Sequence, residues 1–299
     1  MRQFCTLLNA GYITRLLALH DSLLKTCREP FALYILCMDD LTFRILSEQN
    51  LSGVVLVQME DFETDDLRAV RGDREDYEYC WTCTSHFILH VLMRFGLNEV
   101  TYLDADLYFF HDPAILLEEF QQSGGSILLT EHRFTPETEN SESAGIYCVQ
   151  FMTFKADENG VAALRWWGDR CLEWCYATPE PGRFGDQKYV ERFPELFDGI
   201  HVAKHPGGGV ACWNVQQFKL SEGPTVNGYP VVFYHFTQLT WDANMNFNYG
   251  TYRLPYMAKP LFYEPYQRVL EKKIQLIKKR YADEDTDESC YFDLTGALR

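Results

Sequence analysis

The chain has 299 residues, with 27 Lys or Arg against 43 Asp or Glu, and therefore a formal net charge of -16. A phosphate backbone repels such an excess of negative charge, so we do not expect a nucleic acid partner. Because 46% of the residues are hydrophobic, the chain can bury a sizeable core, which excludes a wholly disordered protein.

The first residues carry no export signal. Residues 1–8 lack the apolar segment of a signal peptide, and no run along the chain approaches the roughly 18 apolar residues of a membrane span. Ten cysteines in a chain without a signal are expected to be reduced thiols. Cys80 and Cys83 have the spacing of a zinc knuckle, but no second pair follows, so we do not expect structural zinc. The sequence therefore indicates a cytoplasmic protein.

Strands alternate with helices in the first part of the chain. The expected strands are 4–8, 31–38, 54–57 and 100–110, and the expected helices are 13–27, 41–49 and 87–95. The densely charged segment 61–78 is expected to be turn-like, and residues 111–113 end the fourth strand. This alternation predicts an α/β fold with a parallel sheet and right-handed crossovers.

The second part of the chain continues the pattern without a linker or an internal repeat. We expect strands at 126–129, 147–154 and 231–236, a Trp-rich helix at 159–176, and a glycine loop at 207–209. A basic helix at 268–281 precedes the acidic run 283–288. Its apolar face is only about one turn deep, which favours packing on the edge of the domain over contact with an anionic membrane.

Asp104 and Asp106 occupy alternate positions near the end of the fourth expected strand, so both side chains should leave the same face. Ligands bind at the carboxyl ends of strands in open α/β sheets, and paired carboxylates suit Mg²⁺ or Mn²⁺ bound to phosphate. The same spacing recurs in the acidic tail, so the pattern alone is weak. The alternative is a solvated strand end with two idle aspartates. His235 ends another apolar strand and is either a third metal ligand or a core histidine.

Residues 102–106, Tyr-Leu-Asp-Ala-Asp, resemble the metal motif of nucleotide-sugar glycosyltransferases with the GT-A fold, particularly glycosyltransferase family 8. The similarity continues in the same order over about residues 1–240, at 147–153, 185–187, 213–214 and 235–237. The resemblance implies one α/β domain, 1–245, with a mixed, mainly parallel central sheet flanked by helices. Residues 1–125 would form its nucleotide-binding half and 126–245 its donor-sugar and acceptor half. A helical extension with an acidic tail would occupy 246–299.

Two departures mark a divergent branch of that family. The Asn-Ser-Gly that contacts the donor sugar is absent, and of the residues in its place only Gln150 is expected to make such a contact. Residues 238–241 stand where the family has the lysine that meets the diphosphate. Arg133 is expected to offset phosphate charge instead, since guanidinium groups bind phosphate well.

The resemblance also implies a role for each site residue. Asp104, Asp106 and His235 would hold Mn²⁺ or Mg²⁺ on the diphosphate of the donor, although Asp104 is also a candidate for ribose contact. The expected nucleotide-binding residues are Asn9, Ala10, Tyr12, Asp104, Ala105 and Arg133, and the expected catalytic residues are Asp186, Gln187 and Gln150. Asp186 would bind the donor sugar or act as a general base, with a helix N-cap as the alternative. Tyr12 is equally well read as a surface residue at the start of a helix.

The resemblance thus implies a metal-dependent glycosyltransferase that moves a sugar from a nucleoside diphosphate, UDP above others, to a saccharide or glycolipid-type acceptor with retention. One alternative is a nucleotidyltransferase that makes sugar nucleotides, although residues 9–12 lack the basic residue of its phosphate loop. The other is a non-catalytic module that binds nucleotide sugars. Contact with the inner face of a membrane would use the basic helix 268–281.

Overall fold

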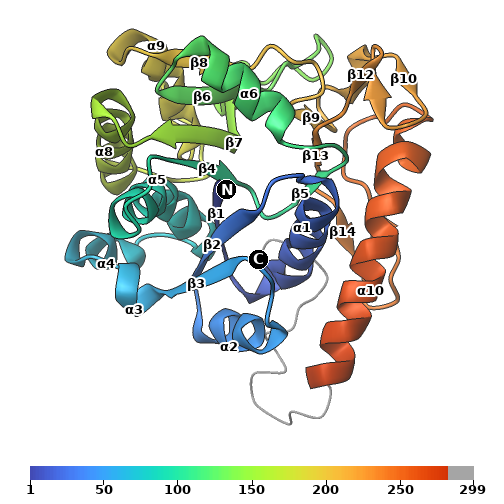
Figure 1. Cartoon of the computed structure of the whole chain (residues 1–299), viewed down its shortest axis with the longest axis horizontal. Helices are drawn as coiled ribbons and strands as arrows, with labels where there is room; N and C mark the ends of the chain where they lie inside the picture. The colour runs from blue at the N-terminus through green and yellow to red at the C-terminus, as the bar shows by residue number, and fades with distance from the viewer. Residues whose placement is uncertain (282–299) are drawn as a thin grey trace.

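A mixed seven-stranded sheet forms the centre of the computed structural model, which describes residues 1–281 (Figure 1). Its strand order is β3-β2-β1-β4-β7-β6-β8. The strands are β1 (Arg2–Leu8), β2 (Phe31–Cys37), β3 (Val54–Gln58), β4 (Glu99–Leu103), β6 (Ile127–Glu131), β7 (Tyr147–Lys155) and β8 (Ile200–Val202). Pairs within β1 to β4 are parallel, as is β6 with β8, whereas β7 is antiparallel to both neighbours. The predicted mixed, mainly parallel sheet is confirmed.

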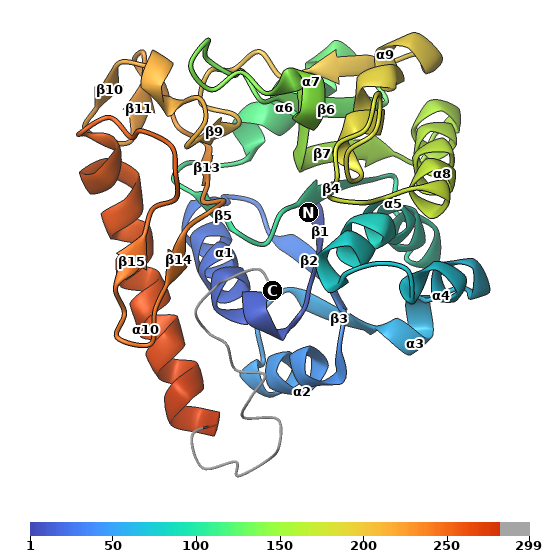
Figure 2. The ribbon, with the colours of Figure 1, turned by 180° about the vertical axis from the view of Figure 1, so that it is seen from behind.

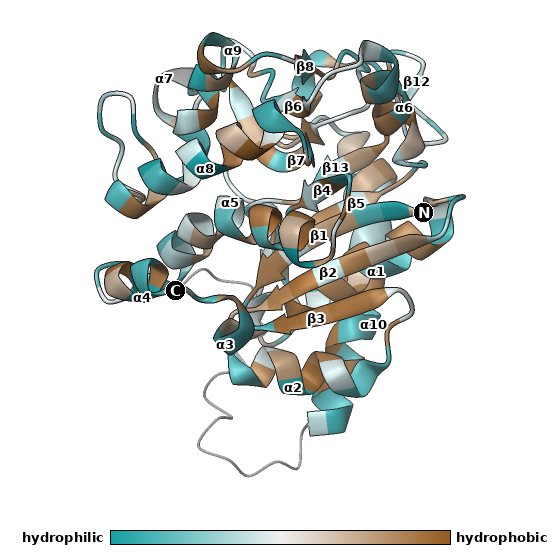
Figure 3. Cartoon of the chain, turned by 60° about the vertical axis from the view of Figure 1, so that its left-hand side comes forward, coloured by the Kyte–Doolittle hydropathy of each residue, from teal (hydrophilic) through white to brown (hydrophobic). Residues whose placement is uncertain are grey.

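Helices cover both faces of the sheet because alternate strand residues point to opposite sides. Phe4, Leu33 and Ile35 pack in one core with α1 (Ile13–Thr26), α2 (Asp40–Gln49) and α6 (Ala114–Ser123). Tyr34 and Leu36 pack in a second core with α5 (Asp76–Arg94) and α8 (Glu158–Glu173). Figure 3 shows the apolar strands β1 to β3 between helices that carry polar residues on their outer sides. The hydrophobic effect therefore fixes the layer order.

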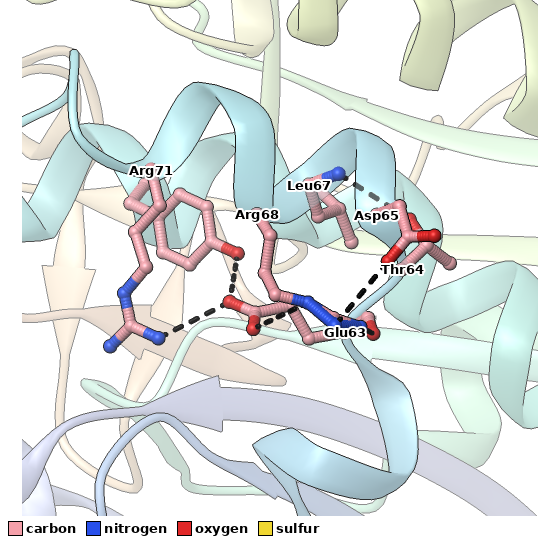
Figure 4. Close-up of polar contacts among 7 residues, drawn as sticks. Glu63, Thr64, Asp65, Leu67, Arg68 and Arg71 are labelled. Carbon is pink, nitrogen blue, oxygen red and sulfur yellow. Dashed lines mark hydrogen bonds and ion pairs between the residues drawn. The ribbon is translucent and has the colours of Figure 1, made fainter.

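The segment 61–78, predicted to be turn-like, is helical instead. It contains the end of α3 (Met59–Phe62), all of α4 (Asp65–Arg71) and the start of α5. Most of its charged side chains are exposed, while Phe62, Leu67 and Glu78 are buried. The backbone N of Leu67 donates to Thr64 Oγ1, which caps α4, and Arg68 and Arg71 converge on Glu63 (Figure 4). The charge density hid this short apolar stripe from the sequence analysis.

The predicted fourth strand, 100–110, is two strands. β4 ends at Leu103, the chain turns through residues 104–106, and β5 (Leu107–Phe109) joins a small sheet of order β5-β13-β9. In this sheet β13 (Phe233–His235) is antiparallel to β5 and parallel to β9 (Val210–Ala211). The backbone N of Asp104 donates to Gln150 O at 3.0 Å, and Leu107 N donates to Asp104 O at 3.2 Å, which closes the turn. The two aspartates therefore lie in a turn and not along a strand.

The C-terminal helix α10 (Glu264–Tyr281) packs against α1, as Figures 1 and 2 both show. Tyr266, Leu270 and Ile274 are buried in the core that α1 shares, and Lys273 Nζ lies 2.7 Å from Asp21 Oδ2. The predicted packing on the edge of the domain is confirmed. The boundary near residue 245 stays a prediction, and the acidic run 283–288 lies outside the described residues. Within residues 1–281, no helix has the length and apolarity to span a membrane.

The remaining elements are short and connect these layers. They are α7 (Ser141–Ala144), α9 (Phe193–Leu196), η1 (Ala10–Tyr12), η2 (Gln187–Arg192), η3 (Val215–Gln217), η4 (Lys259–Tyr263), β10 (Leu220–Ser221), β11 (Thr225–Val226), β12 (Tyr229–Pro230), β14 (Thr240–Trp241) and β15 (Phe247–Asn248). β10 to β12 form one small sheet and β14 pairs with β15. Two of these elements, η1 and η2, contribute to the site described next.

Candidate active site

A cavity of about 1080 Å³ opens at the carboxyl ends of β1, β2 and β4. Its walls come from segments far apart in the sequence, namely residues 7–12, 38–41, 104–106 and 184–187, together with parts of α5 and the loop after β13. Open α/β sheets bind ligands at this edge, where strand order reverses. The size slightly exceeds the roughly 300–1,000 Å³ of sites that bury most of a small molecule.

Three predicted metal ligands meet in this cavity. One ligand atom each from Asp104, Asp106 and His235 can be chosen so that all three lie within 4.8 Å of one another, and in residues 1–281 they form the one such group found. His235 Nε2 is 3.1 Å from Asp106 Oδ1 and 3.7 Å from Asp104 Oδ2. Two carboxylates and one imidazole suit Mn²⁺ and similar divalent cations. The predicted cluster therefore exists as a geometric unit.

The turn after β4 and the pairing of β13 with β5 bring these ligands together. His235 lies opposite Leu107, directly after the turn that carries Asp104 and Asp106. The backbone N of Phe236 donates to Asp106 O at 3.2 Å, which joins the two strands beyond the last paired residue. The backbone therefore holds all three ligands with hydrogen bonds, independently of any bound cation.

Burial and mutual charge shift the pKa values of this cluster in opposite directions. Burial raises the pKa of Asp104 to about 7, although the charge of His235 partly opposes this. Burial also acts on Asp106, but the neighbouring His235 outweighs it and holds the pKa of Asp106 below its usual value. Conversely, Asp106 outweighs burial at His235 and holds the pKa of this imidazole well above its usual value. Strong opposed shifts in one cavity are typical of functional sites.

Asp186 and Gln187 line the same cavity beside Asp104. Burial, followed by repulsion from Asp104, raises the pKa of Asp186 to about 8, so its carboxyl is largely neutral at pH 7. Asp186 precedes η2, but its side chain makes no capping hydrogen bond. Trp167 Nε1 donates to its backbone oxygen at 2.8 Å and fixes the segment. The alternative of a plain N-cap is therefore not realised, and the carboxyl faces the cavity.

Asn9, Ala10 and Tyr12 line the cavity at the turn after β1, and Ala105 lines it between the two aspartates. The backbone N of Ala10 donates to Asp39 Oδ2 at 2.9 Å, and Thr42 N donates to Asp39 Oδ1 at 2.7 Å. Asp39 was not among the predicted site residues, although its place at the end of a strand was a usable signal. Its carboxylate ties the turn after β1 to the start of α2.

The structure places Arg133 outside the cavity lining, so its contact with phosphate stays a prediction. Its guanidinium donates to the backbone oxygens of Pro206 and Gly208, and Arg133 does not line the cavity. These carbonyl groups take hydrogen-bond donors that a phosphate would need. The same contacts hold the glycine loop, together with Asn214 Nδ2, which donates to Gly209 O at 2.8 Å. A fixed turn therefore describes the loop 205–209 better than a mobile one.

Gln150 is also placed differently from the expectation. Its side chain is fully buried and lies beneath the cavity wall, so it does not reach a sugar in the cavity. Gln150 Oε1 instead lies 2.9 Å from His235 Nδ1. The sequence placed this residue near the site correctly, but the burial of β7 between β4 and β6 removes it from direct contact.

The α4–α5 corner contributes residues that the sequence analysis missed. Arg71 and Arg74 are the two Lys or Arg residues among the described residues that line the cavity, and Trp81 lines it between Tyr77 and Phe184. Arg71 and Arg74 lie in segment 61–78, where the density of charged residues conceals the helical pattern. Arg15, also missed, lies buried with its guanidinium 4.6 Å from the rings of both Tyr12 and Trp241.

Two Bacillus subtilis (strain 168) proteins are similar to this chain over most of their length. The uncharacterized protein YfnD is 30% identical over 289 residues, which cover 94% of this chain and 92% of YfnD. The uncharacterized protein YfnF is 34% identical over 246 residues, which cover 78% of this chain and 80% of YfnF. The chain belongs to the family of YfnD and YfnF. No protein-family model matches it.

Solved structures establish the fold at low sequence identity. The galactosyltransferase LgtC was crystallised with donor and acceptor sugar analogs. The structural match covers 90% of this member of the YfnD and YfnF family and 95% of the LgtC chain, with TM-score 0.56 and 10% sequence identity. The match to the glycosyltransferase GlyE of Streptococcus pneumoniae TIGR4 covers 91% of this chain and 63% of the GlyE chain, with TM-score 0.51 and 13% sequence identity. The chain has the GT-A fold, as the resemblance implied.

Proposed function

We propose that this protein is a metal-dependent glycosyltransferase that takes its sugar from a nucleoside diphosphate sugar. The observation that carries the proposal is the convergence of Asp104, Asp106 and His235 in one cavity at the ligand-binding edge of a GT-A sheet. LgtC, which shares the fold, was crystallised with donor and acceptor sugar analogs, and this supports the same class of substrates here.

The donor set fits a divalent cation. Asp104, Asp106 and His235 offer two hard oxygens and one nitrogen, and the cavity leaves room beside them for phosphate oxygens. When bound there, the cation neutralises charge on the nucleoside diphosphate that leaves. Mn²⁺ is favoured over Mg²⁺ because of the imidazole, and UDP is favoured by the sequence resemblance.

The chain's own residues divide the substrate between the two ends of the cavity. Asn9, Ala10 and Tyr12 contact the nucleoside, with Ala105 beside the two aspartates. Asp186 and Gln187 contact the donor sugar next to Asp104. A carboxyl that is largely neutral at pH 7 donates a hydrogen bond to a sugar oxygen, so Asp186 serves better here as a binding group than as a permanently ionised nucleophile.

The acceptor is a saccharide or a glycolipid-type hydroxyl, and the anomeric configuration is retained, as the resemblance implies. In the retaining reaction the acceptor oxygen forms the new glycosidic bond while the bond to the diphosphate breaks, and the departing phosphate oxygen takes the acceptor proton. A cytoplasmic location and contact of helix 268–281 with a membrane stay predictions. Because most apolar side chains of α10 are buried and Leu276 is exposed, such contact would use basic residues such as Lys278 and Lys279 together with Leu276.

Titration of UDP, GDP and CDP into the protein, with and without Mn²⁺, tests the site. We expect metal-dependent binding of one nucleotide, lost in Asp106→Asn, followed by release of that nucleotide from one of its sugar conjugates. Binding without turnover across a panel of acceptors would favour the non-catalytic module. Formation of a sugar nucleotide from a sugar phosphate and a nucleoside triphosphate would favour the nucleotidyltransferase instead.

A further inference from the structure

We propose that Gln150 is the positioning residue of the metal site, holding Asp104 through its backbone and His235 through its side chain. This rests on the proposed function, because it assigns a role toward the same cation. The geometry that carries it is a single strand residue with one hydrogen bond to each of two ligand residues.

The side-chain contact fixes which nitrogen of His235 is free to bind a metal. Gln150 Oε1 lies 2.9 Å from His235 Nδ1, and an amide oxygen only accepts hydrogen bonds, so Nδ1 carries the hydrogen. The other nitrogen, Nε2, faces the carboxylates of Asp106 and Asp104. A neutral His235 therefore presents the lone pair of Nε2 to the place between the two carboxylates, where a cation would lie.

The surroundings of Gln150 fix the direction of its amide. Gln150 Nε2 donates to Thr130 Oγ1 at 3.4 Å, so the amide oxygen is left for the histidine. The Thr130 hydroxyl in turn faces the backbone oxygens of Cys148 and Phe151, at 3.4 and 3.5 Å, and donates there while it accepts from Gln150. In this direction each donor of the chain meets an acceptor.

Packing holds the Gln150 amide and the His235 imidazole in place. Gln150 is fully buried on β7, between β4 and β6, and its backbone oxygen accepts from Asp104 N at 3.0 Å. The Trp213 ring packs edge-on against His235, with ring centroids 5.3 Å apart. Gly209 leaves room for the amide, because a Cβ there would lie 3.1 Å from Gln150 Nε2. The imidazole is thus fixed by neighbours on more than one side, before any cation arrives.

If Gln150 positions His235, removing its side-chain amide should weaken metal binding. Hydrogen-bond partners of ligating histidines orient the ring, and their loss typically costs about 10- to 100-fold in metal affinity. A buried glutamine that merely filled space would affect the stability of the fold and leave metal affinity unchanged. Measuring metal affinity and fold stability on the same variants therefore distinguishes a positioning role from a space-filling one.

The experiment compares Gln150→Leu, which removes both amide groups, with Gln150→Glu, which keeps an acceptor toward His235. Thr153→Val is the matched control, because Thr153 is buried on the same strand and its hydroxyl bonds to Thr101 Oγ1 at 2.9 Å, away from the site. Free Mn²⁺ is measured by electron paramagnetic resonance in the presence of UDP, alongside the thermal midpoint of each variant. We expect the Mn²⁺ dissociation constant to rise about 10- to 100-fold in Gln150→Leu and to stay unchanged in Thr153→Val. We expect Gln150→Glu to bind more tightly than Gln150→Leu.

Equal Mn²⁺ affinity of wild type and Gln150→Leu would overturn the positioning role and leave the proposed function standing. Absence of Mn²⁺–UDP binding by the wild type would overturn both. If Gln150→Leu does not fold, long-range ¹H–¹⁵N spectra of histidine-labelled wild type with Mg²⁺ and UDP decide the matter. The His235 signal is assigned by its absence from His235→Asn. A hydrogen on Nδ1 supports the proposal, and a hydrogen on Nε2 overturns it.

Discussion

The Nε2 atom of His235 lies 3.1 Å from Oδ1 of Asp106, although the two residues come from different parts of the chain. The link between them is the antiparallel pairing of β13 with β5, which sets His235 opposite Leu107. A carboxylate, an imidazole and a second carboxylate thus converge through backbone pairing and not through the coordination of a bound ion. The predictions below test what this preformed cluster does.

Asp106→Asn should abolish Mn²⁺-dependent nucleotide binding. The substitution keeps the shape of a buried side chain but removes the charge that a divalent cation needs, and it removes the ion pair with His235. Isothermal titration with Mn²⁺ and UDP measures the effect. Asp198→Asn, at an exposed aspartate outside the cavity, should bind as the wild type does. Metal-dependent binding by Asp106→Asn would contradict the assignment of this ligand.

The affinity for Mn²⁺ should rise with pH through neutrality. Without metal, burial raises the pKa of Asp104 to about 7, so below that pH a proton occupies the carboxyl that the cation needs. The raised pKa of His235 acts in the same direction, because its Nε2 must also lose a proton. Each displaced proton lowers the apparent affinity about tenfold for each pH unit below the pKa.

Titrations at pH 6 in buffers of different ionisation enthalpy count the protons released when Mn²⁺ binds. We expect at least one proton at pH 6 and fewer at pH 9. An affinity that does not change between pH 6 and pH 9 would show that neither group is a metal ligand.

The cluster of Asp104, Asp106 and His235 was easier to predict from the sequence than the structure that surrounds it. Asp104 and Asp106 follow an apolar strand and His235 ends another, and strand ends of an α/β sheet meet at one edge. The small sheet that joins them was not predictable, because the pairing of Leu107 with His235 is non-local. The contacts of Arg133 were not predictable for a similar reason: its position after a strand is visible in the sequence, but the carbonyl groups of Pro206 and Gly208 that accept its hydrogen bonds are not.

Gln150 and the segment 61–78 show two further limits of sequence reasoning. Alternation along β7 puts Gln150 on the same face as Cys148, which the sequence can indicate, but its full burial depends on both neighbouring strands. In segment 61–78 the charged residues outnumber the buried ones, so Phe62 and Leu67 gave too weak a periodic signal to predict α3 and α4.

Asp186→Asn should retain Mn²⁺–UDP binding and turnover, because an amide, like a neutral carboxyl, donates a hydrogen bond to the sugar, and it should stabilise the fold more at pH 8 than at pH 5. The folded pKa of about 8 is higher than that of an unfolded aspartate, so the folded wild type loses stability as pH rises from the unfolded to the folded value. An amide has no charge to bury and avoids this loss. The two proteins share every other titratable group, so the change with pH in the difference between their free energies of unfolding reports on Asp186.

Urea unfolding at both pH values measures this difference, and release of nucleotide from the donor measures turnover. A stability difference that does not depend on pH would show that Asp186 is not held neutral by burial. Loss of turnover in Asp186→Asn would show that the reaction needs an ionised carboxylate at this position and not a neutral hydrogen-bond donor.

Arg15→Lys should weaken nucleotide binding without changing the net charge. The planar guanidinium lies 4.6 Å from the rings of Tyr12 and Trp241, and Arg15 Nη2 donates to Leu239 O at 2.8 Å. It therefore ties the turn after β1 to the loop after His235, and an ammonium group cannot stack or hydrogen-bond in the same way. We expect a loss of about 1–3 kcal/mol in the free energy of unfolding, since buried hydrogen bonds to charged groups contribute that much.

Arg165→Lys, at an exposed position on α8, is the control for this substitution. We expect it to match the wild type in urea unfolding and in titration with UDP and Mn²⁺. If Arg15→Lys also matches the wild type in both, the contacts with Tyr12 and Trp241 do not shape the nucleotide end of the cavity. Weaker UDP binding with unchanged Mn²⁺ affinity is the result that places Arg15 at the nucleoside and away from the metal ligands.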